Sequence, residues 1–308
     1  MAMSPASLEM TVTAHVLDSD SDAGGDDTSS VSTQFTLTVD PEADEVTFTA
    51  GSASGAEDSW IDLNSSFQLS DTDGSESVSS VTLSGIPDGA ELQLADGTAI
   101  TVTGGSAEIP MSAVTGDGES YSLDGVQVKP PADSNENFAL GIDVTTVDSN
   151  GVTSDSQQTS GTISVEVASV ADEATIDAGD ITATEDAGAI ALNLDAAVGD
   201  TDGSESITAI DISGVPDTVQ LSAGTDNGDG SWSLTPDQLQ GLTATVDGDV
   251  SGVFDMSVTA HVLDADSDSG GDDTIATTKD FTLTINPEAD GVSITEAAPA
   301  AMRMSGLR

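Results

Sequence analysis

A heptapeptide with three carboxylates, DTDGSES, occurs at residues 71–77 and again, letter for letter, at residues 200–206. Two aspartates separated by one residue and followed by glycine can turn both carboxylates towards one ion, because glycine supplies the unrestricted φ of a wrapping loop. The heptads therefore predict calcium-binding loops, since calcium takes several oxygen ligands. The alternative interpretation is a solvated Asx turn that satisfies only local backbone donors. The acidic side chains of the two copies are Asp71, Asp73, Glu76, Asp200, Asp202 and Glu205.

The composition selects cations as partners. The 308-residue chain is 36% apolar, enough for folded domains, and has 56 Asp plus Glu against 4 Lys plus Arg, a formal net charge of -52. Nucleic acid and anionic membranes reward cationic surfaces, so we exclude both as partners. Without cysteine, thiolate metal sites are excluded, which leaves hard, oxygen-ligated ions. No run approaches eighteen apolar residues, so we expect no direct membrane insertion.

Internal repeats divide the chain. LSGIPD at residues 83–88 recurs as ISGVPD at 212–217, at the same separation of 129 residues as the heptads. MTVTAHVLDSDSD, from Met10, recurs as MSVTAHVLDADSD, from Met256, at a separation of 246 residues. These matches predict the C-terminal part of a truncated repeat, two full repeats and a stub, and we do not expect the truncated copy to form a complete sandwich. The predicted segments are 1–44, 45–172, 173–290 and 291–308.

The stub leaves the pattern of the repeats at about residue 301. The string EDSWI at residues 57–61 predicts E, D, W and I at positions 303, 304, 306 and 307. One permitted codon choice for residues 302–308 reads EDEWI after a shift of reading frame, which fits all four positions. We expect a frameshift in a longer tandem array, with a cloning tail as the alternative.

The apolar pattern within each repeat is that of β-strands. Apolar residues alternate with Thr, Ser or acidic residues at period two, and Gly, Asp, Asn and Ser clusters separate the runs. Helical periodicity is limited to one turn from Pro236, and the absence of crossover helices excludes parallel α/β folds. We therefore predict an all-β chain of tandem Greek-key β-sandwiches in an elongated array. The clearest predicted strands are 78–86, 99–109, 138–147 and 161–170, with a hairpin at 225–232.

The repeated acids fall at the ends of these strands or in linkers. An antiparallel sandwich collects alternate loops at one pole, so carboxylates from different loops are expected to converge there. Calcium needs six to eight oxygens, and convergence would supply them. Besides the heptads, the expected ligands are Asp44, Glu57, Asp58, Asp148, Asp172, Glu185, Asp186 and Asp290.

A second acidic cluster places Asp at every second position. LDSDSDAGGDD at 17–27 and LDADSDSGGDD at 263–273 begin like an EF-hand loop, but Gly falls one place late and the terminal Glu is missing. Calcium binding and a solvated loop both remain open here. The candidate ligands are Asp264, Asp266 and Asp268.

Catalysis has no support in the sequence, and we expect a protein that is not an enzyme. His15 and His261 occupy the same position of different repeats, and no nucleophile elbow, HExxH or phosphate loop is present. Acid pairs of the glycosidase kind need an apolar pocket, whereas these acids lie in Gly-rich loops.

The order of motifs resembles a known family. EDAGAIALNL, DTDGSESITAIDISGVPD, NGDGSWSLTPDQLQGL, VTAHVLD and DFTLTINPEAD follow one another as in the cadherin-like or immunoglobulin-like tandem repeats of bacterial RTX adhesins. The resemblance spans residues 45–290 and the partial copy at 1–44, and it is weaker in the first full repeat. It implies calcium-dependent extender domains that are exported by type I secretion to the surface of a Gram-negative cell. It also implies calcium ligands at Asp44, Asp172, the Glu-Asp pairs and the heptad acids.

We therefore expect a calcium-rigidified stalk segment, in which neighbouring repeats are the partners and a distal domain supports adhesion or biofilm formation. One alternative is a glycan- or protein-binding module, for which residues 116–137 provide the only long divergent loop. Another is a secreted structural protein of a halophile, whose acidity serves solvation alone.

Overall fold

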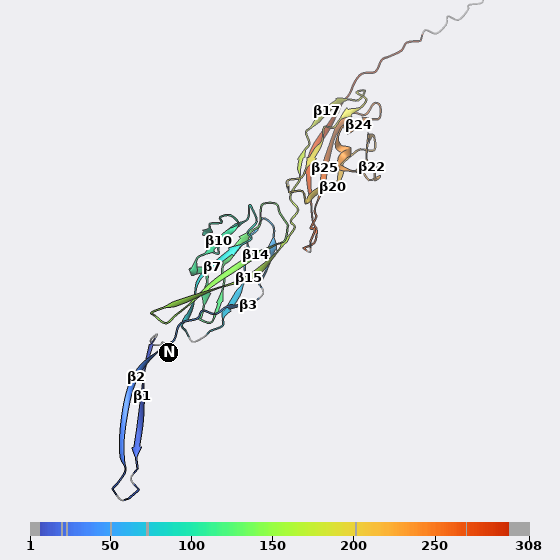
Figure 1. Ribbon diagram of the computed structural model, residues 1–308. Helices are drawn as coiled ribbons and strands as arrows, with labels where there is room; N and C mark the ends of the chain where they lie inside the picture. The colour runs from blue at the N-terminus through green and yellow to red at the C-terminus, as the bar shows by residue number, and fades with distance from the viewer. Residues whose placement is uncertain are drawn as a thin grey trace, which may run out of the picture. The chain divides into compact units, whose positions relative to one another are not determined.

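The computed structural model describes residues 7–19, 21–22, 24–49, 51–71, 74–200, 202–268 and 270–295, and apart from two short 3-10 turns its regular structure is β (Figure 1). These residues form two compact units. Unit 1 comprises the described residues of Met1–Ala171 together with Asp200–Glu205 and Asp264–Thr274. Unit 2 comprises those of Asp172–Gly199, Ser206–Leu263 and Ile275–Arg308. The predicted all-β class with sandwich-like sheets is confirmed.

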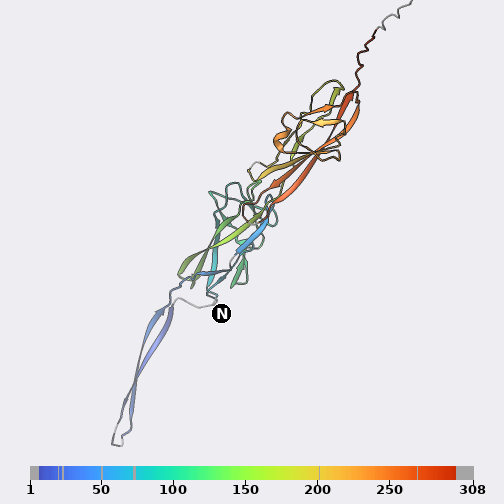
Figure 2. The same cartoon turned by 90° about the vertical axis from the view of Figure 1, so that its right-hand side faces the viewer.

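Unit 1 begins with a long hairpin. Strands β1 (Ser7–Asp18) and β2 (Asp27–Thr38) pair antiparallel along their whole length and run side by side, in blue, in Figure 1 and in Figure 2. Every described residue of both strands is exposed. The two strands form a two-stranded sheet of their own.

The rest of unit 1 is a sandwich with one five-stranded and two four-stranded sheets. The strand orders are β10-β7-β14-β15-β4, β11-β12-β6-β3 and β5-β13-β8-β9. One core cluster draws on all three sheets, with Phe67, Leu83 and Val126 fully buried. The strands are β3 (Val46–Thr49), β4 (Gly51–Ala56), β5 (Ile61–Asp62), β6 (Ser66–Leu69), β7 (Glu76–Ser84), β8 (Glu91–Leu94), β9 (Ala99–Ile100), β10 (Ser106–Ile109), β11 (Thr115–Gly116), β12 (Ser120–Ser122), β13 (Val126–Lys129), β14 (Phe138–Ser149) and β15 (Ser154–Ala168).

Unit 2 repeats this plan. A six-stranded sheet has the order β17-β26-β25-β20-β23-β22, and two smaller sheets pair β18-β24-β21 and β16-β19. Its core includes Ile210, Trp232 and Val258. The strands are β16 (Thr175–Asp177), β17 (Ile181–Thr184), β18 (Ile190–Ala191), β19 (Asp195–Ala197), β20 (Glu205–Ser213), β21 (Val219–Leu221), β22 (Thr225–Asp226), β23 (Ser231–Leu234), β24 (Thr243–Val246), β25 (Gly252–Asp264) and β26 (Asp273–Asn286), β20, β25 and β26 each having one or two end residues in unit 1.

Among the described strands, each sandwich has one parallel pair, which lies at a sheet edge. The short strand β4 runs parallel to the long β15, and β17 runs parallel to β26. In both cases the pair joins an early strand of the sandwich to its last strand. The sheets are therefore mixed, a detail that the sequence pattern did not reveal.

The predicted strands are observed with one exception. The ranges 78–86, 138–147 and 161–170 correspond to β7, β14 and β15, and the 225–232 hairpin is formed by β22 and β23. The single strand predicted for 99–109 is wrong, because the chain turns between β9 and β10. Gly104 and Gly105 have φ of 58° and 75°, and Thr103 and Ser106 exchange backbone hydrogen bonds across this turn.

Two further segments differ from a simple strand-and-loop pattern. Pro236–Leu239 is a 3-10 turn with a Thr235–Gln238 capping box, in agreement with the predicted helical turn, and Met111–Ala113 is its counterpart in unit 1. The supposed long loop at 116–137 is wrong, because it contains β12 and β13. No helix in the described ranges is long and apolar enough to cross a membrane.

The turn after β20 gives a test of the fold of unit 2. Gly214 has a φ of 77°, and an added Cβ would collide with the backbone carbonyl of Asp255. Gly228 has the same φ of 77°, but its surroundings are open within 4 Å. We expect Gly214→Ala to reduce the free energy of unfolding by about 1–3 kcal/mol more than Gly228→Ala, since only the former adds overpacking to backbone strain. Chemical denaturation followed by tryptophan fluorescence measures both, and equal losses would contradict the collision.

Candidate metal centres

Strand register brings three carboxylates of unit 1 into one row. Glu76 on β7 lies directly opposite Asp148 on β14, and Asp148 lies directly opposite Asp155 on β15. Opposed residues on neighbouring strands project from the same face of a sheet, and like charges in this arrangement destabilise it. The sequence predicted Glu76 and Asp148 as ligands but missed Asp155. The row and two further acids form the first acidic site, which consists of Asp44, Asp71, Glu76, Asp148 and Asp155.

The linker before β3 binds this row through its backbone. The N–H of Glu42 donates to Oδ2 of Asp148 (3.0 Å), and the N–H of Ala43 donates to Oδ2 of Asp155 (3.1 Å). The next N–H, that of Asp44, donates to Oε1 of Glu76 (2.6 Å). Three consecutive linker amides thus hold one oxygen of each carboxylate and leave the other oxygen for a different partner.

The remaining oxygens of the first acidic site are partly orphaned. Glu76 and Asp148 are only 7% and 9% exposed, and their atoms Oε2 and Oδ1 are buried with no hydrogen-bond partner among the described residues. Burial is the main cause that raises the pKa of Glu76, and the charges of Asp44 and Asp71 raise it further, against the hydrogen bond from Asp44. Orphaned buried oxygens are costly unless a cation or a proton occupies the space beside them.

The same arrangement recurs in unit 1 at the second linker. The N–H of Val170 donates to Oδ2 of Asp264 (3.1 Å), and the N–H of Ala171 donates to Oδ2 of Asp273 (3.1 Å). These bonds repeat those of Glu42 and Ala43, because Asp264 and Asp273 occupy the positions of Asp148 and Asp155 at the end of one long strand and the start of the next. We call the following carboxylates the second acidic site: Glu57, Asp200, Glu205, Asp264, Asp266 and Asp273.

Two carboxylates of the second acidic site share one donor. Oε1 of Glu57 also accepts the N–H of Val170, at 2.6 Å, so Glu57 and Asp264 converge on a single amide. The two side chains are 3% and 0% exposed, and Oε2 of Glu57 has no hydrogen-bond partner within the described part of the chain. Burial first, then the hydrogen bond with Asp264 and the charges of Asp264 and Asp200, raise the pKa of Glu57 to about 8. Without a cation, a proton stays on Glu57 near neutral pH.

Polar groups from neighbouring loops fix the second acidic site. Asn135 donates through Nδ2 to Oδ1 of Asp264 (3.1 Å) and to the carbonyl oxygen of Ala265 (3.2 Å). Ser169 donates its hydroxyl to the carbonyl oxygen of Gly271 (2.8 Å), which orders the loop after Asp264. Oδ2 of Asp266 in that loop is buried and has no hydrogen-bond partner among the described residues. The role of Asn135 was missed, because no motif at 130–137 signals it.

The second heptad divides between site and turn. Asp200 and Glu205 are 5% and 8% exposed, and the N–H of Asp200 donates to Oε2 of Glu205 (3.3 Å). Asp202 accepts the N–H and the hydroxyl of Ser204, both at 2.7 Å, as in an Asx turn. Both interpretations of the heptad therefore describe parts of it. In the first heptad Asp73 lies outside the described residues.

A third acidic group lies in unit 2 and is open to solvent. Oε1 of Glu185 accepts the N–H of Glu288 (2.8 Å), as Glu57 accepts that of Val170. The charges of Asp249 and then Asp186 raise the pKa of Asp290, so these carboxylates lie near one another. Asp249, which the sequence did not reveal, has a φ of 63°. The group consists of Glu185, Asp186, Asp249 and Asp290.

Three predicted ligands do not belong to these sets, although a carboxylate oxygen of Asp58 lies within 4.8 Å of one of Asp133 in unit 1. Oδ1 of Asp58 lies 3.8 Å from Nζ of Lys129, so a cation already accompanies this carboxylate. Asp268 accepts the N–H of Asn137 at 3.4 Å and is exposed. Asp172 is exposed and begins unit 2. Their role as ligands stays a prediction.

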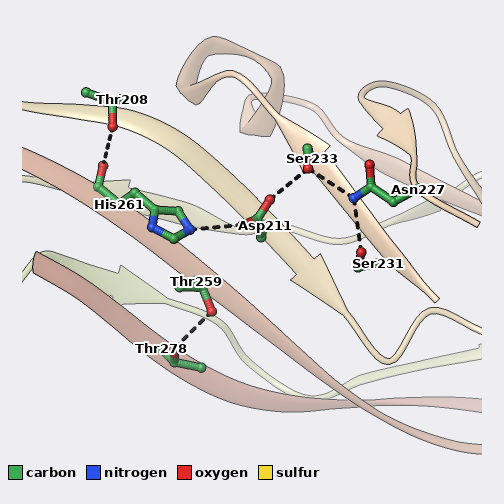
Figure 3. A network of polar contacts seen from close by, with 8 residues as sticks. All are labelled: Thr208, Asp211, Asn227, Ser231, Ser233, Thr259, His261 and Thr278. Atoms are coloured by element: carbon green, nitrogen blue, oxygen red, sulfur yellow. Dashed lines mark hydrogen bonds and ion pairs between the residues drawn. The ribbon is translucent and has the colours of Figure 1, made fainter. Parts of the chain in front are cut away.

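The polar network around His261 in unit 2 does not have the order of a nucleophilic triad (Figure 3). Nε2 of His261 lies 2.9 Å from Oδ2 of Asp211, and the Ser233 hydroxyl donates to Oδ1 of the same carboxylate at 2.9 Å. The aspartate therefore separates the histidine from the hydroxyl, whereas a triad needs histidine between them. The network links β25, β20 and β23, and Thr208 adds a bond to the carbonyl of His261 (3.2 Å).

The donor sets of the two buried sites fit calcium. All candidate ligands are carboxylate oxygens, the element of choice for hard cations, and no thiolate is present in the chain. Among the described residues, no donor reaches the orphaned buried oxygens of Glu57, Glu76, Asp148 and Asp266, and a cation would satisfy them. Magnesium retains several waters, and so it suits a buried cluster of converging carboxylates less than calcium does.

Comparison with solved structures finds matches of low sequence identity. The titin domains Z1Z2 in complex with telethonin are 14% identical over 80% of this chain and 100% of that chain, with a TM-score of 0.28. Human protocadherin-24 EC1-2 is 12% identical over 79% and 99%, with a TM-score of 0.31. Domains 4–9 of the surface layer protein SbsC are 17% identical over 89% of this chain but only 35% of theirs, with a TM-score of 0.22. No family model matches the chain, and no curated protein matches it.

Glu57 predicts an unusual pH dependence in the absence of metal. Its pKa of about 8 in the folded state exceeds the ordinary 4.5, so the folded state keeps a proton that the unfolded state has lost. In EDTA, stability must therefore fall as the pH rises from about 5 to about 8, and we expect the melting temperature of unit 1 to drop by several degrees. Calorimetry of the wild type and of Glu57→Gln tests this, because the glutamine does not titrate. A curve of the same slope for both proteins would contradict the assignment.

Proposed function

We propose that this chain is a calcium-rigidified spacer, in which bound ions fix the linkers of successive β-sandwich repeats. One observation carries the proposal, the recurrence of the same linker-to-carboxylate hydrogen bonds at Glu42–Ala43 and at Val170–Ala171. A recognition surface would be expected to vary between repeats, whereas a structural joint repeats its geometry.

The ion has a definite physical task at each linker. Buried carboxylates repel one another and lose hydration, and removing or pairing their charge is the only way to keep them close. A divalent cation neutralises the charge, and the linker amides stay bound to the carboxylate oxygens that already accept their hydrogen bonds. The linker then loses its freedom to swing, because its own N–H groups are part of the ligand framework. Free calcium at about 0.1–1 mM, the range of extracellular modules, is sufficient for this purpose.

The proposed setting is the surface of a Gram-negative bacterium. A chain with the motif order of RTX adhesin repeats would be exported by type I secretion, fold in external calcium and hold a distal adhesive domain away from the cell. The neighbouring repeats of the same chain are its partners, and it performs no catalysis. Its role in adhesion or biofilm formation is then the sum of many such spacers.

A calcium titration of stability tests the ion sites. We expect the melting temperature to rise by more than about 10 °C with millimolar calcium, and by much less with equal magnesium or with high NaCl, since binding to the folded state alone stabilises it. Asp148→Asn should lose a large part of this rise, because it removes a buried charge of the first acidic site. Asp96→Asn, at an exposed turn where the carboxylate caps the N–H of Thr98, is the matched control.

The outcome also separates the alternatives. A rise produced equally by NaCl would assign the acids to solvation, as in a halophile. Equal calcium responses of Asp148→Asn and Asp96→Asn would show that the buried acids are not ligands.

Rigidity itself can be measured in the same protein. The chain lacks cysteine, so Glu119→Cys in unit 1 and Asp217→Cys in unit 2 place one dye in each unit at exposed positions. Single-molecule energy transfer should give a narrow distance distribution in calcium and a broad one in EDTA. Glu57→Gln with Asp264→Asn should remain broad in calcium. A narrow distribution in EDTA would mean that the linker is stiff without the ion, and the spacer mechanism would fail.

A further inference from the structure

The β1–β2 hairpin has one apolar and one polar face. Residues that pair directly across an antiparallel ladder project from the same side, so the register assigns each pair to a face. Leu8 pairs with Leu37 and Met10 with Phe35. The pair between them joins Glu9 to Thr36, and the flanking pairs join Ser7 to Thr38 and Thr11 to Gln34. Beyond Met10 the apolar face continues with Val12, Ala14, Val16 and Val31.

This apolar face is open, although the same sequence is buried elsewhere. Met10, Val12 and Phe35 are 40%, 54% and 45% exposed. Their equivalents in the second full repeat are Met256, Val258 and Phe281, which are 3%, 0% and 3% exposed. Leu37 differs from Leu283 in the same way. Side chains of one sequence pattern thus occupy two environments.

The second repeat shows what covers them. Its equivalent strands β25 and β26 have β20 on one side and β17 on the other, and the core beneath them includes Leu192, Val219 and Ala244 from the facing strands. All these elements come from the earlier part of the repeat, residues 173–251. Among the described residues, hairpin β1–β2 has neither side strand nor facing sheet.

We propose that the apolar face and the two open edges of hairpin β1–β2 bind a polypeptide with the strand pattern of residues 173–251, which completes a sandwich. The second repeat indicates this occupant. There the segment covers side chains of the same types at the positions equivalent to Met10, Val12, Phe35 and Leu37. A two-stranded hairpin is marginally stable alone and gains from added strands and a facing layer.

A second hairpin of the same kind is a poorer occupant. Two hairpins in contact would place identical apolar faces against each other. Neither would supply the side strands that β17 and β20 provide next to β26 and β25 in the second repeat.

The test uses the full chain as acceptor and a separate polypeptide of residues 173–251 as probe. In unit 2 the chain itself fills the equivalent site, whereas no described residue fills it at the hairpin. We expect one probe to bind per chain and amide hydrogen exchange in β1 and β2 to slow at least tenfold. Met10→Asp should abolish the protection, and Thr11→Asp, on the polar face of the same strand, should keep it.

Three results would overturn the proposal. The first is no slowing of exchange in β1 and β2 at probe excess. The second is equal binding by Met10→Asp and Thr11→Asp, which would locate the probe elsewhere. The third is a chain that sediments as a dimer without probe, becomes monomeric in Met10→Asp and ignores the probe, which would identify a second copy as the occupant.

Discussion

The structure of unit 1 depends on one electrostatic conflict, the crowding of buried carboxylates at the ends of neighbouring strands. Glu76, Asp148 and Asp155 face one another across a continuous ladder, and Glu57 and Asp264 share one amide donor. With 56 acidic and 4 basic residues, the chain has almost no internal means to neutralise them. A proton or an external cation must therefore enter, and the choice between the two sets how firmly the linkers are bound.

The crowded carboxylates are connected directly to the linker by hydrogen bonds. Backbone amides of Glu42, Ala43 and Asp44 occupy one side of the carboxylates, so any change in charge on the other side acts directly on the chain path between repeats. The change of charge therefore reaches the linker without an intervening hinge. The buried part is small and polar, whereas the sandwich core of Phe67 and its neighbours is independent of it.

The sequence predicted the features that depend on local residue patterns. Period-two alternation gives the long strands, and repeated acids at strand ends give Glu76, Asp148 and Asp264. Asp155 was missed although its equivalent, Asp273, stands in a recognised acidic string, because register across β14 and β15 is a property of pairing and not of spacing. Asn135 was missed for a similar reason, since nothing in a loop sequence states which other loop it meets. The turn at Gly104 and Gly105, which divides 99–109, was missed because the alternation of apolar and polar residues gives no signal of it.

The parallel edge pairs give the repeats a mechanical character. Because β4 runs parallel to β15 and β17 to β26, a pull on the two ends of a repeat loads these pairs along their length. All their backbone hydrogen bonds must then break together, whereas an antiparallel pair pulled from one end opens bond by bond. If the protein were pulled at both ends, these edge pairs would resist the unfolding of each sandwich.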